Sequence, residues 1–396
     1  MNSTPNAQRI QIGFFGRINV GKSSVVNAIT GQDLAVVSAI KGTTTDPVSK
    51  AMELLPLGPV NIIDTAGLDD TGELGLLRIN KTKEVLNKVD VAILVADAQT
   101  GLTEIENELI NTFKQKNISY IIAFNKSDLI QIPQNHNENE IYVSALNKTN
   151  IFELKELIAK LNNKKENENF LIKDIINRDD IVILVTPIDE SAPKGRLILP
   201  QQQVIRELLE IGAITTIIKE TQLKETLKKI TPKVIITDSQ VFGKVDKITP
   251  QKILLTSFSI LFARYKGILK YAVEGIKKLE NLKDNDTILI SEGCTHHRQC
   301  NDIGSVKLPN WIKNHTNKNL NFEFTSGNTF PKDLSKYAMI IHCGACMLNE
   351  KEVLHRYEEA NKQNISISNY GITIAYIHNI LKRSIEIFPE IHSKLN

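Results

Sequence analysis

The chain has 396 residues, of which 41% are hydrophobic and 23% are charged, so it is long enough to bury more than one apolar core. Its 48 basic and 45 acidic residues leave a net charge of +3 and are spread along the chain, a balance that argues against binding to nucleic acid or to a membrane surface. The first nine residues contain no apolar signal core, and no apolar run approaches the length that spans a bilayer. The sequence therefore predicts a cytoplasmic protein.

Short apolar runs rich in Ile and Val alternate with longer helix-like stretches through residue 161. This alternation is typical of a parallel sheet with helices between its strands. The expected strands lie at 10–15, 60–63, 91–95, 120–124 and 141–143. Residues 162–169 contain no apolar side chain, which indicates a solvated linker and a domain boundary near residue 165.

The alternation of short apolar runs and helix-like stretches resumes after the linker and predicts two further α/β domains. Expected strands lie at 181–186, 213–219 and 233–237, and two helical stretches follow from about residue 251. Further strands are expected at 287–291 and 337–342. We therefore expect domains at 1–165, 170–250 and 251–396.

A phosphate-binding loop is predicted directly after the first strand. Residues 16–23 fit G-x-x-x-x-G-K-S, between a strand and a helix-like stretch as that motif requires. Lys22 would contact the β and γ phosphates, and the Ser23 hydroxyl would bind magnesium. The nucleotide-contacting residues expected here are Asn19, Val20, Gly21, Lys22, Ser23 and Ser24.

Three more elements follow later strands in the order that GTPases require. Asp64-Thr65-Ala66-Gly67 would place a carboxylate near magnesium and the Gly67 amide near the γ phosphate. Asn125-Lys126-Ser127-Asp128 resembles the N-K-x-D element that reads guanine, with Asp128 accepting from the base. Ser144-Ala145-Leu146 resembles the loop that backs the guanine. All lie just beyond the carboxyl ends of strands, so we expect a P-loop GTPase domain that binds GTP with magnesium.

Residues 42–46, Gly-Thr-Thr-Thr-Asp, resemble the switch I signature of GTPases related to TrmE and Era. Thr44 is the expected magnesium ligand, with Thr43 as the alternative. Lys22, Thr44, Asp64 and Gly67 are the predicted catalytic residues.

Position 68, where Ras-like proteins carry a water-orienting glutamine, is Leu68, which predicts slow hydrolysis. The TrmE-like P-loop asparagine implies potassium-stimulated hydrolysis with Asn19 as a potassium ligand. Asp69, Asp70 and Glu73 could position water or could be surface carboxylates.

All four cysteines lie within the last 103 residues, and in a reducing compartment such a cluster favours metal binding over disulfides. Cys294-x-His296 follows one expected strand and His342-Cys343-x-x-Cys346 follows another, so both segments could meet at one sheet edge. Thiolate ligands at this spacing select zinc or an iron–sulfur cluster, and the residues alone leave both open.

A TrmE-like GTPase followed by C-x-H, 45 residues and H-C-x-x-C resembles the FeFe-hydrogenase maturation GTPases, the HydF family. The resemblance extends over nearly the whole chain, including residues 191–201 and 294–304. It implies a 4Fe-4S cluster on Cys294, Cys343 and Cys346. Family members differ in the fourth ligand, for which His296 and His342 are the candidates, with Cys300, Asp302 or solvent as alternatives.

The resemblance also implies a carrier or scaffold that receives a di-iron precursor made with two radical-SAM maturases. It would deliver this precursor to the FeFe-hydrogenase catalytic subunit, with the middle domain forming a homodimer. The alternative is a TrmE-like or Era-like GTPase that acts on tRNA or the ribosome and holds structural zinc. That alternative predicts a basic C-terminal surface, and the sequence shows no basic cluster there.

Overall fold

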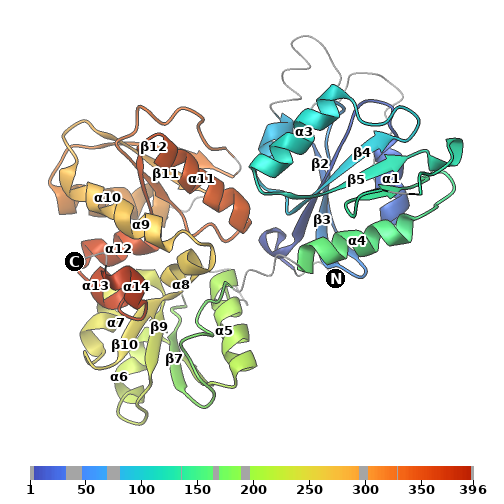
Figure 1. Cartoon of the computed structure of the whole chain (residues 1–396). Coiled ribbons are helices and arrows are strands. Elements are labelled where there is room, and N and C mark those ends of the chain that lie inside the picture. Colours follow the sequence, from blue (N-terminus) through green and yellow to red (C-terminus); the bar gives the residue numbers. More distant parts are fainter. Residues whose placement is uncertain are drawn as a thin grey trace. The chain divides into compact units, whose positions relative to one another are not determined.

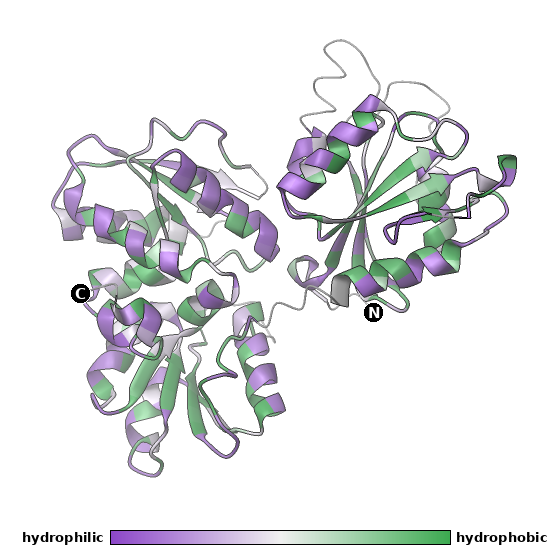
Figure 2. Cartoon of the chain, viewed as in Figure 1, coloured by the Kyte–Doolittle hydropathy of each residue, from purple (hydrophilic) through white to green (hydrophobic). Residues whose placement is uncertain are grey.

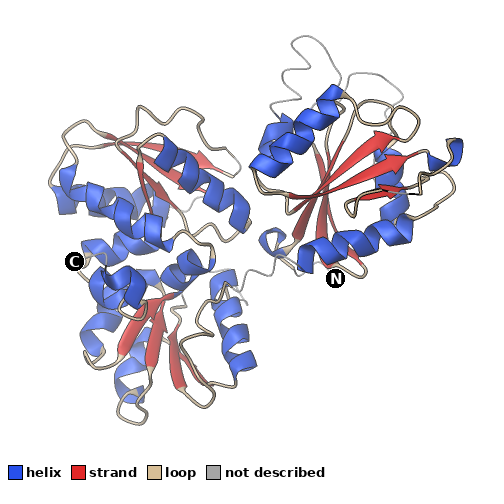
Figure 3. Cartoon of the chain, in the orientation of Figure 1, coloured by secondary structure: helices blue, strands red, loops and turns tan. Residues whose placement is uncertain are grey.

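The computed structural model describes residues 4–32, 47–68, 81–134, 136–163, 169–188, 197–293, 302–327 and 329–393. The chain divides into two compact units, Met1–Asn167 and Glu168–Asn396, which are considered separately (Figure 1). Both units consist of sheets covered by helices (Figure 3). Figure 2 shows that apolar residues concentrate in the strands and on the helix faces that cover them.

The first unit contains a six-stranded sheet in the order β2-β3-β1-β4-β5-β6. Only β2 runs antiparallel to its neighbour. The strands are β1 (Ile10–Phe15), β2 (Val48–Leu54), β3 (Gly58–Asp64), β4 (Val91–Asp97), β5 (Ser119–Asn125) and β6 (Glu140–Tyr142). Helices in the described part of this unit include α1 (Lys22–Thr30), α3 (Glu104–Gln115) and α4 (Ile151–Asn163), and residues 81–86 are also helical.

Strand β4 shows why the expected strands are apolar throughout. Its alternate residues enter two different cores: Val91, Ile93 and Val95 pack with α1 and α4, whereas Ala92, Leu94 and Ala96 pack with α3. A parallel strand covered on both faces has no solvent side and so carries no polar alternation. The predicted P-loop domain with a parallel sheet is confirmed. Strand β2 was not predicted from the sequence, because most of its side chains are exposed.

The second unit contains two parallel four-stranded sheets, β10-β9-β7-β8 and β12-β11-β13-β14. The middle sheet comprises β7 (Ile181–Val185), β8 (Ile214–Ile218), β9 (Val234–Thr237) and β10 (Leu254–Ser257). The C-terminal sheet comprises β11 (Thr287–Glu292), β12 (Asn321–Ser326), β13 (Met339–His342) and β14 (Ser366–Asn369). The prediction of two further α/β domains is thus confirmed.

The middle sheet extends beyond residue 250, where the sequence predicted only helices. Strand β10 is four residues long and leads directly into α8, so its apolar run could not be separated from the helix by periodicity. The longer helices of the unit are α5 (Leu199–Ile211), α8 (Phe258–Tyr265), α9 (Leu269–Ile276), α10 (Leu308–Thr316), α11 (Glu350–Lys362) and α12 (Tyr370–Ile377). The shorter ones are α6 (Leu223–Thr226), α7 (Phe242–Ile248), α13 (Leu381–Ser384) and α14 (Pro389–His392).

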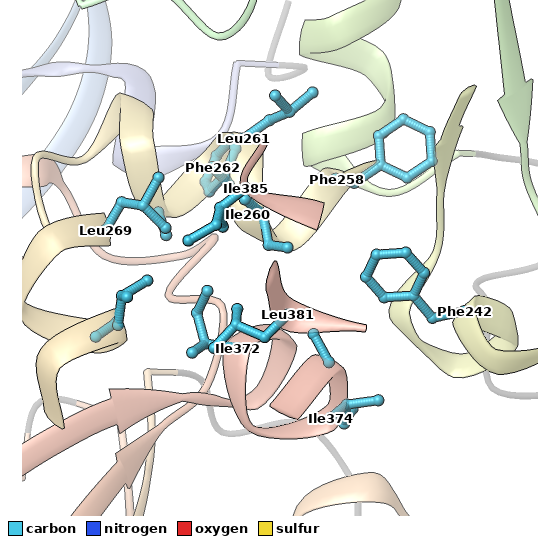
Figure 4. Close-up of a cluster of buried hydrophobic side chains, with 14 of the residues drawn as sticks. Phe242, Phe258, Ile260, Leu261, Phe262, Leu269, Ile372, Ile374, Leu381 and Ile385 are labelled. Atoms are coloured by element: carbon cyan, nitrogen blue, oxygen red, sulfur yellow. The ribbon is translucent and has the colours of Figure 1, made fainter. Parts of the chain in front are cut away.

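One continuous apolar core joins the two sheets of the second unit. Where they meet, Phe242 of α7 and Phe258 of α8 lie near Ile372 of α12 and Leu381 of α13 (Figure 4). The chain therefore returns from the C-terminal sheet to complete the core of the middle sheet.

Hydrogen bonds from Arg383 hold α13 against the middle domain. Arg383 Nη1 donates to Asp246 Oδ1 at 2.7 Å, and its Nη2 donates to the carbonyls of Thr249 (3.0 Å) and Pro250 (2.8 Å). The Arg383 side chain is only 11% exposed, so these bonds replace nearly all of its contact with water.

We expect Arg383→Met to destabilise the second unit by about 2–3 kcal/mol, since hydrogen bonds to a largely buried charged group are lost and Asp246 loses its partner. Trp311, the sole tryptophan, lies on α10, so its fluorescence during urea unfolding reports on this unit. The control is Arg206→Met, because Arg206 pairs with Glu210 on the exposed surface of α5. Equal urea midpoints for the two variants would contradict the prediction.

Candidate nucleotide and metal sites

The phosphate-binding loop connects β1 to α1 and contains two glycines that no other residue could replace. Gly21 has φ 83°, and a Cβ there would lie 2.3 Å from Asn125 Nδ2. A Cβ at Gly16 would lie 2.4 Å from the Val95 carbonyl oxygen. The loop is thus packed tightly against the ends of β4 and β5, and α1 begins at Lys22 with the free amides of its first turn available to an anion.

Three predicted residues meet at the start of α1. The buried Lys22 ammonium donates to Asp64 Oδ1, and Ser23 Oγ donates to Asp64 Oδ2 at 3.3 Å. A cation, a hydroxyl and a carboxylate at a helix N-terminus are the groups that bind phosphate together with a magnesium ion.

The segment after β3 is held against the phosphate-binding loop. Thr65 is buried, and its Oγ1 donates to the Phe14 carbonyl of β1 at 2.7 Å. A Cβ at Gly67 would lie 2.4 Å from Ile18 Cγ1, so only glycine allows this approach. Gly67 therefore lies beside the loop, and its contact with the γ phosphate stays a prediction. Leu68, at 7% exposed, is buried.

Asn125 ties together the elements that would surround the base. Its Nδ2 donates to the Val20 carbonyl at 3.0 Å, and its Oδ1 accepts from the Ala145 amide at 3.0 Å. Ser144 Oγ donates to Asp128 Oδ1 at 2.5 Å, which orients the carboxylate expected to read guanine. Ser24 and Leu146, also predicted to contact nucleotide, are exposed.

Sequence reasoning missed Asp97, the last residue of β4. Its Oδ2 accepts from Lys126 Nζ at 2.6 Å, and Lys126 itself has φ 66°. Burial would raise the pKa of Asp97, but hydrogen bonds from Lys126 and the Gln99 amide, with the charges of Lys126 and Arg17, hold it below its usual value. The sequence did offer one signal for Asp97. It ends an apolar strand, and the strands before and after it in the chain both end in GTPase motifs.

Several predicted residues lie outside the described parts of the chain. They are Thr43, Thr44, Asp69, Asp70, Glu73, Cys294, His296 and Cys300. The remaining cysteines, Cys343 and Cys346, follow β13.

The Cys343 thiol lies at the edge where β11 and β13 end side by side. Its Sγ accepts from the Gly293 amide at 3.0 Å and from the Ala345 amide at 3.3 Å. Two amides directed at one sulfur favour its thiolate form. Gly293, whose amide contacts this sulfur, directly precedes Cys294 in the sequence.

Burial raises the pKa of the Cys346 thiol, and Cys343 adds to the rise, whereas the positive charge of Lys266 opposes it. Lys266, which sequence analysis did not identify, is 3% exposed and donates from Nζ to the carbonyl oxygens of Ala345, at 2.9 Å, and Leu348.

His342 is fully buried and both ring nitrogens are hydrogen-bonded. Its Nε2 lies 3.0 Å from Arg356 Nη1, and because arginine can only donate, Nε2 accepts. Nδ1 then carries the proton and donates to the Cys343 carbonyl at 3.0 Å. To bind a metal ion, His342 would have to give up one of these bonds. Its role as fourth ligand stays a prediction.

A buried carboxylate lies at the end of β11, the strand that precedes Cys294 in the sequence. Glu292, the last residue of β11, is 5% exposed and accepts from Tyr370 Oη at 3.2 Å. Burial and the charge of Glu292 raise the pKa of Tyr370 above its usual range. Asp302 caps the helical turn Ile303–Lys307. Its Oδ2 accepts from the Ser305 amide at 2.9 Å and from the Ser305 hydroxyl at 3.0 Å.

Within the described ranges, no group of three or more His, Cys, Asp or Glu side chains is placed to hold a metal ion. The same ranges include no helix with the length and apolar character needed to cross a membrane.

Three family models match the chain in succession. Residues 11–126 match the 50S ribosome-binding GTPase model, residues 171–267 the hydrogen maturase F dimerization domain, and residues 270–387 the hydrogen maturase F tetramerization domain. The two hydrogen maturase F models together cover more than half of the chain.

Curated relatives resemble part of the chain. The tRNA modification GTPase MnmE of Mesoplasma florum is 33% identical over 186 residues, which are 45% of this chain and 38% of MnmE. GTPase Der of Campylobacter concisus is 39% identical over 126 residues, 31% of this chain and 27% of Der. The chain thus spans less than two-fifths of the length of these relatives.

Solved structures also resemble part of the chain. Aquifex aeolicus Era bound to GDP.AlF4- is 20% identical, with a TM-score of 0.36, and the match covers 53% of this chain and 92% of Era. A probable GTP-binding protein engB is 23% identical, with a TM-score of 0.33, covering 39% of this chain and 100% of that chain.

The order of a GTPase domain, a dimerization domain and a tetramerization domain confirms the family expected from the sequence motifs. The chain belongs to the hydrogen maturase F family.

Proposed function

We propose that this chain is a GTP-hydrolysing scaffold that holds a 4Fe-4S cluster on Cys294, Cys343 and Cys346. It would assemble or deliver the di-iron precursor of an FeFe-hydrogenase. The observation that carries the proposal is the hydrogen bond from the Gly293 amide to the Cys343 sulfur, because Gly293 directly precedes Cys294 in the sequence. Family membership supports the hydrogenase partner and the two radical-SAM maturases.

The donor set fits such a cluster. Thiolates are the ligands that iron–sulfur clusters prefer, and amide hydrogen bonds to the sulfur, as found at Cys343, tune their potential. When bound, the cluster would supply an iron that lacks a fourth thiolate and can accept an exchangeable ligand. The hydrogen bonds already made by His342 favour His296 over His342 for that place, with Cys300, Asp302 and solvent as the alternatives.

The nucleotide part of the proposal rests on the cluster of Lys22, Ser23 and Asp64. GTP would place its β and γ phosphates on the α1 amides and Lys22, with magnesium held by Ser23, Thr44 and Asp64. Leu68 is buried and apolar, so it cannot orient water, and hydrolysis would be slow. Asn19 would bind a potassium ion that supplies the missing charge.

A second copy of this chain would pair along β8. This strand is at the edge of the middle sheet and pairs only with β7 in the described part of the chain. Ile214 and Ile217 on β8 are 53% and 48% exposed, and an exposed apolar edge strand readily accepts another strand. Residues 171–267 match a dimerization domain, which supports a homodimer through this edge.

We expect GTP turnover to be several-fold faster in potassium than in sodium at equal ionic strength, since the ion would neutralise charge that develops between the phosphates. Asn19→Ala should remove the difference while leaving GDP binding measurable. Phosphate release measures GTP turnover, and GDP titration measures nucleotide binding. Asn27→Ala, on α1 beyond the loop, is the control. Equal wild-type turnover in the two salts would rule out potassium stimulation.

Anaerobic reconstitution with iron and sulfide should give about four irons per chain and a reducible cluster seen by electron paramagnetic resonance. Cys343→Ser should lose the cluster, because it removes one of the three thiolates that would hold it. Cys300→Ala should retain it and is the matched control. Stoichiometric zinc without a reducible cluster would contradict the scaffold function and leave a GTPase with a structural metal.

We expect Ile217→Lys to convert the dimer to a monomer, because it places a charge in an apolar contact repeated by two-fold symmetry. Light scattering coupled to size-exclusion chromatography measures the mass. Ile105→Lys, at an exposed isoleucine of α3 in the first unit, is the control and should leave the mass unchanged. A dimer that survives Ile217→Lys would place the interface elsewhere.

A further inference from the structure

Lys266 is a buried cation that no part of the proposed function uses. It is the first residue after α8 and is 3% exposed. Its ammonium donates to the carbonyl oxygens of Ala345, at 2.9 Å, and of Leu348. These two carbonyls lie on either side of Cys346 in the sequence, so a single side chain holds both flanks of the loop that carries the thiol.

The charge environment of Lys266 differs from that of the other buried cation near the cysteines. Arg356 is 1% exposed and has a carboxylate partner, Glu352 Oε1, at 2.8 Å. Both hydrogen-bond acceptors of Lys266 are neutral backbone carbonyls. Burial lowers the pKa of Lys266 to about 8, and the negative charges of Cys346, Glu350, Cys343 and Glu352 oppose that fall.

A fixed cation beside thiolates has two physical effects. It favours the charged form of the sulfur, which is the form that binds iron. It also stabilises an additional electron on an anionic cluster and so raises the reduction potential. Because backbone carbonyls do not neutralise the ammonium, its charge acts on the neighbouring sulfur atoms.

We propose that Lys266 is a positioning residue for the cluster of the proposed function: its ammonium fastens the Cys343–Leu348 segment and sets the cluster's reduction potential. The inference rests on the proposed function, since it requires a cluster on these thiolates. Lys266 belongs to the segment that matches the dimerization domain, whereas Cys343 and Cys346 belong to the segment that matches the tetramerization domain. The Lys266 hydrogen bonds therefore connect the cluster loop to the dimer-forming part.

The test compares reconstituted full-length wild type with Lys266→Met, which keeps the length of the side chain and removes its charge. We expect Lys266→Met to lower the midpoint potential, changing the reduced-to-oxidised ratio at fixed potential about tenfold, which corresponds to about 59 mV for a one-electron couple. Lys270→Met, at an exposed position of the next helix, α9, is the control and should leave the potential unchanged. Redox titration followed by electron paramagnetic resonance gives both values.

An unchanged potential in a folded Lys266→Met protein overturns the inference. If Lys266→Met does not fold, as judged by Trp311 fluorescence, Lys266→Gln and Lys266→Arg decide the question. A folded glutamine variant must show the lower potential. If only arginine folds and keeps the wild-type potential, the cation is required and the inference stands. If none of the three variants folds, Lys266 has a packing role and the inference is overturned. Absence of a reducible cluster in wild type would instead refute the proposed function.

Discussion

Parallel strand pairing is the constraint on which both candidate sites depend. Parallel strands end at the same edge, so residues far apart in the chain become neighbours once the register is set. In the first unit this brings Val20, Asn125 and Ala145 into one hydrogen-bonded group. In the second unit the register of Ser291 with His342 places Gly293 beside the Cys343 sulfur.

Both sites are also supported by polar groups that are themselves buried. Asn125 is 3% exposed and holds the phosphate-binding loop and the base-facing loop in one arrangement. In the second unit, Arg356 hydrogen-bonds to His342. Lys266, at the end of α8, hydrogen-bonds to the loop that carries Cys346. A buried polar group that loses a partner is costly, so each of these contacts makes the local backbone resistant to rearrangement.

The sequence predicted the parts of this structure that repeat a local pattern. The expected strand at 10–15 coincides with β1, and the P-loop glycines lie where their spacing placed them. Strands β2, β10, β12 and β14 were not predicted. No side chain of β12 and only one of β2 is buried, and β10 and β14 are four residues long, too short to show a period. Asp97, Glu292 and Lys266 were also missed. Their roles come from tertiary contacts with residues far along the chain, and single polar residues at element ends carry no periodic signal.

The return of α13 to the middle sheet determines when each part of the chain is able to fold during synthesis. A chain leaves the ribosome from its N-terminus, and domains fold as units once their residues have emerged. The first unit is complete at Asn167, so it is able to form its nucleotide site while the rest is being translated. The core of the second unit requires Leu381 and Ile385, which follow the last strand of the C-terminal sheet in the chain. The core beneath the loop that carries Cys343 and Cys346 is therefore completed only after Ile385 has been made, whereas the first unit is able to form its nucleotide site well before then.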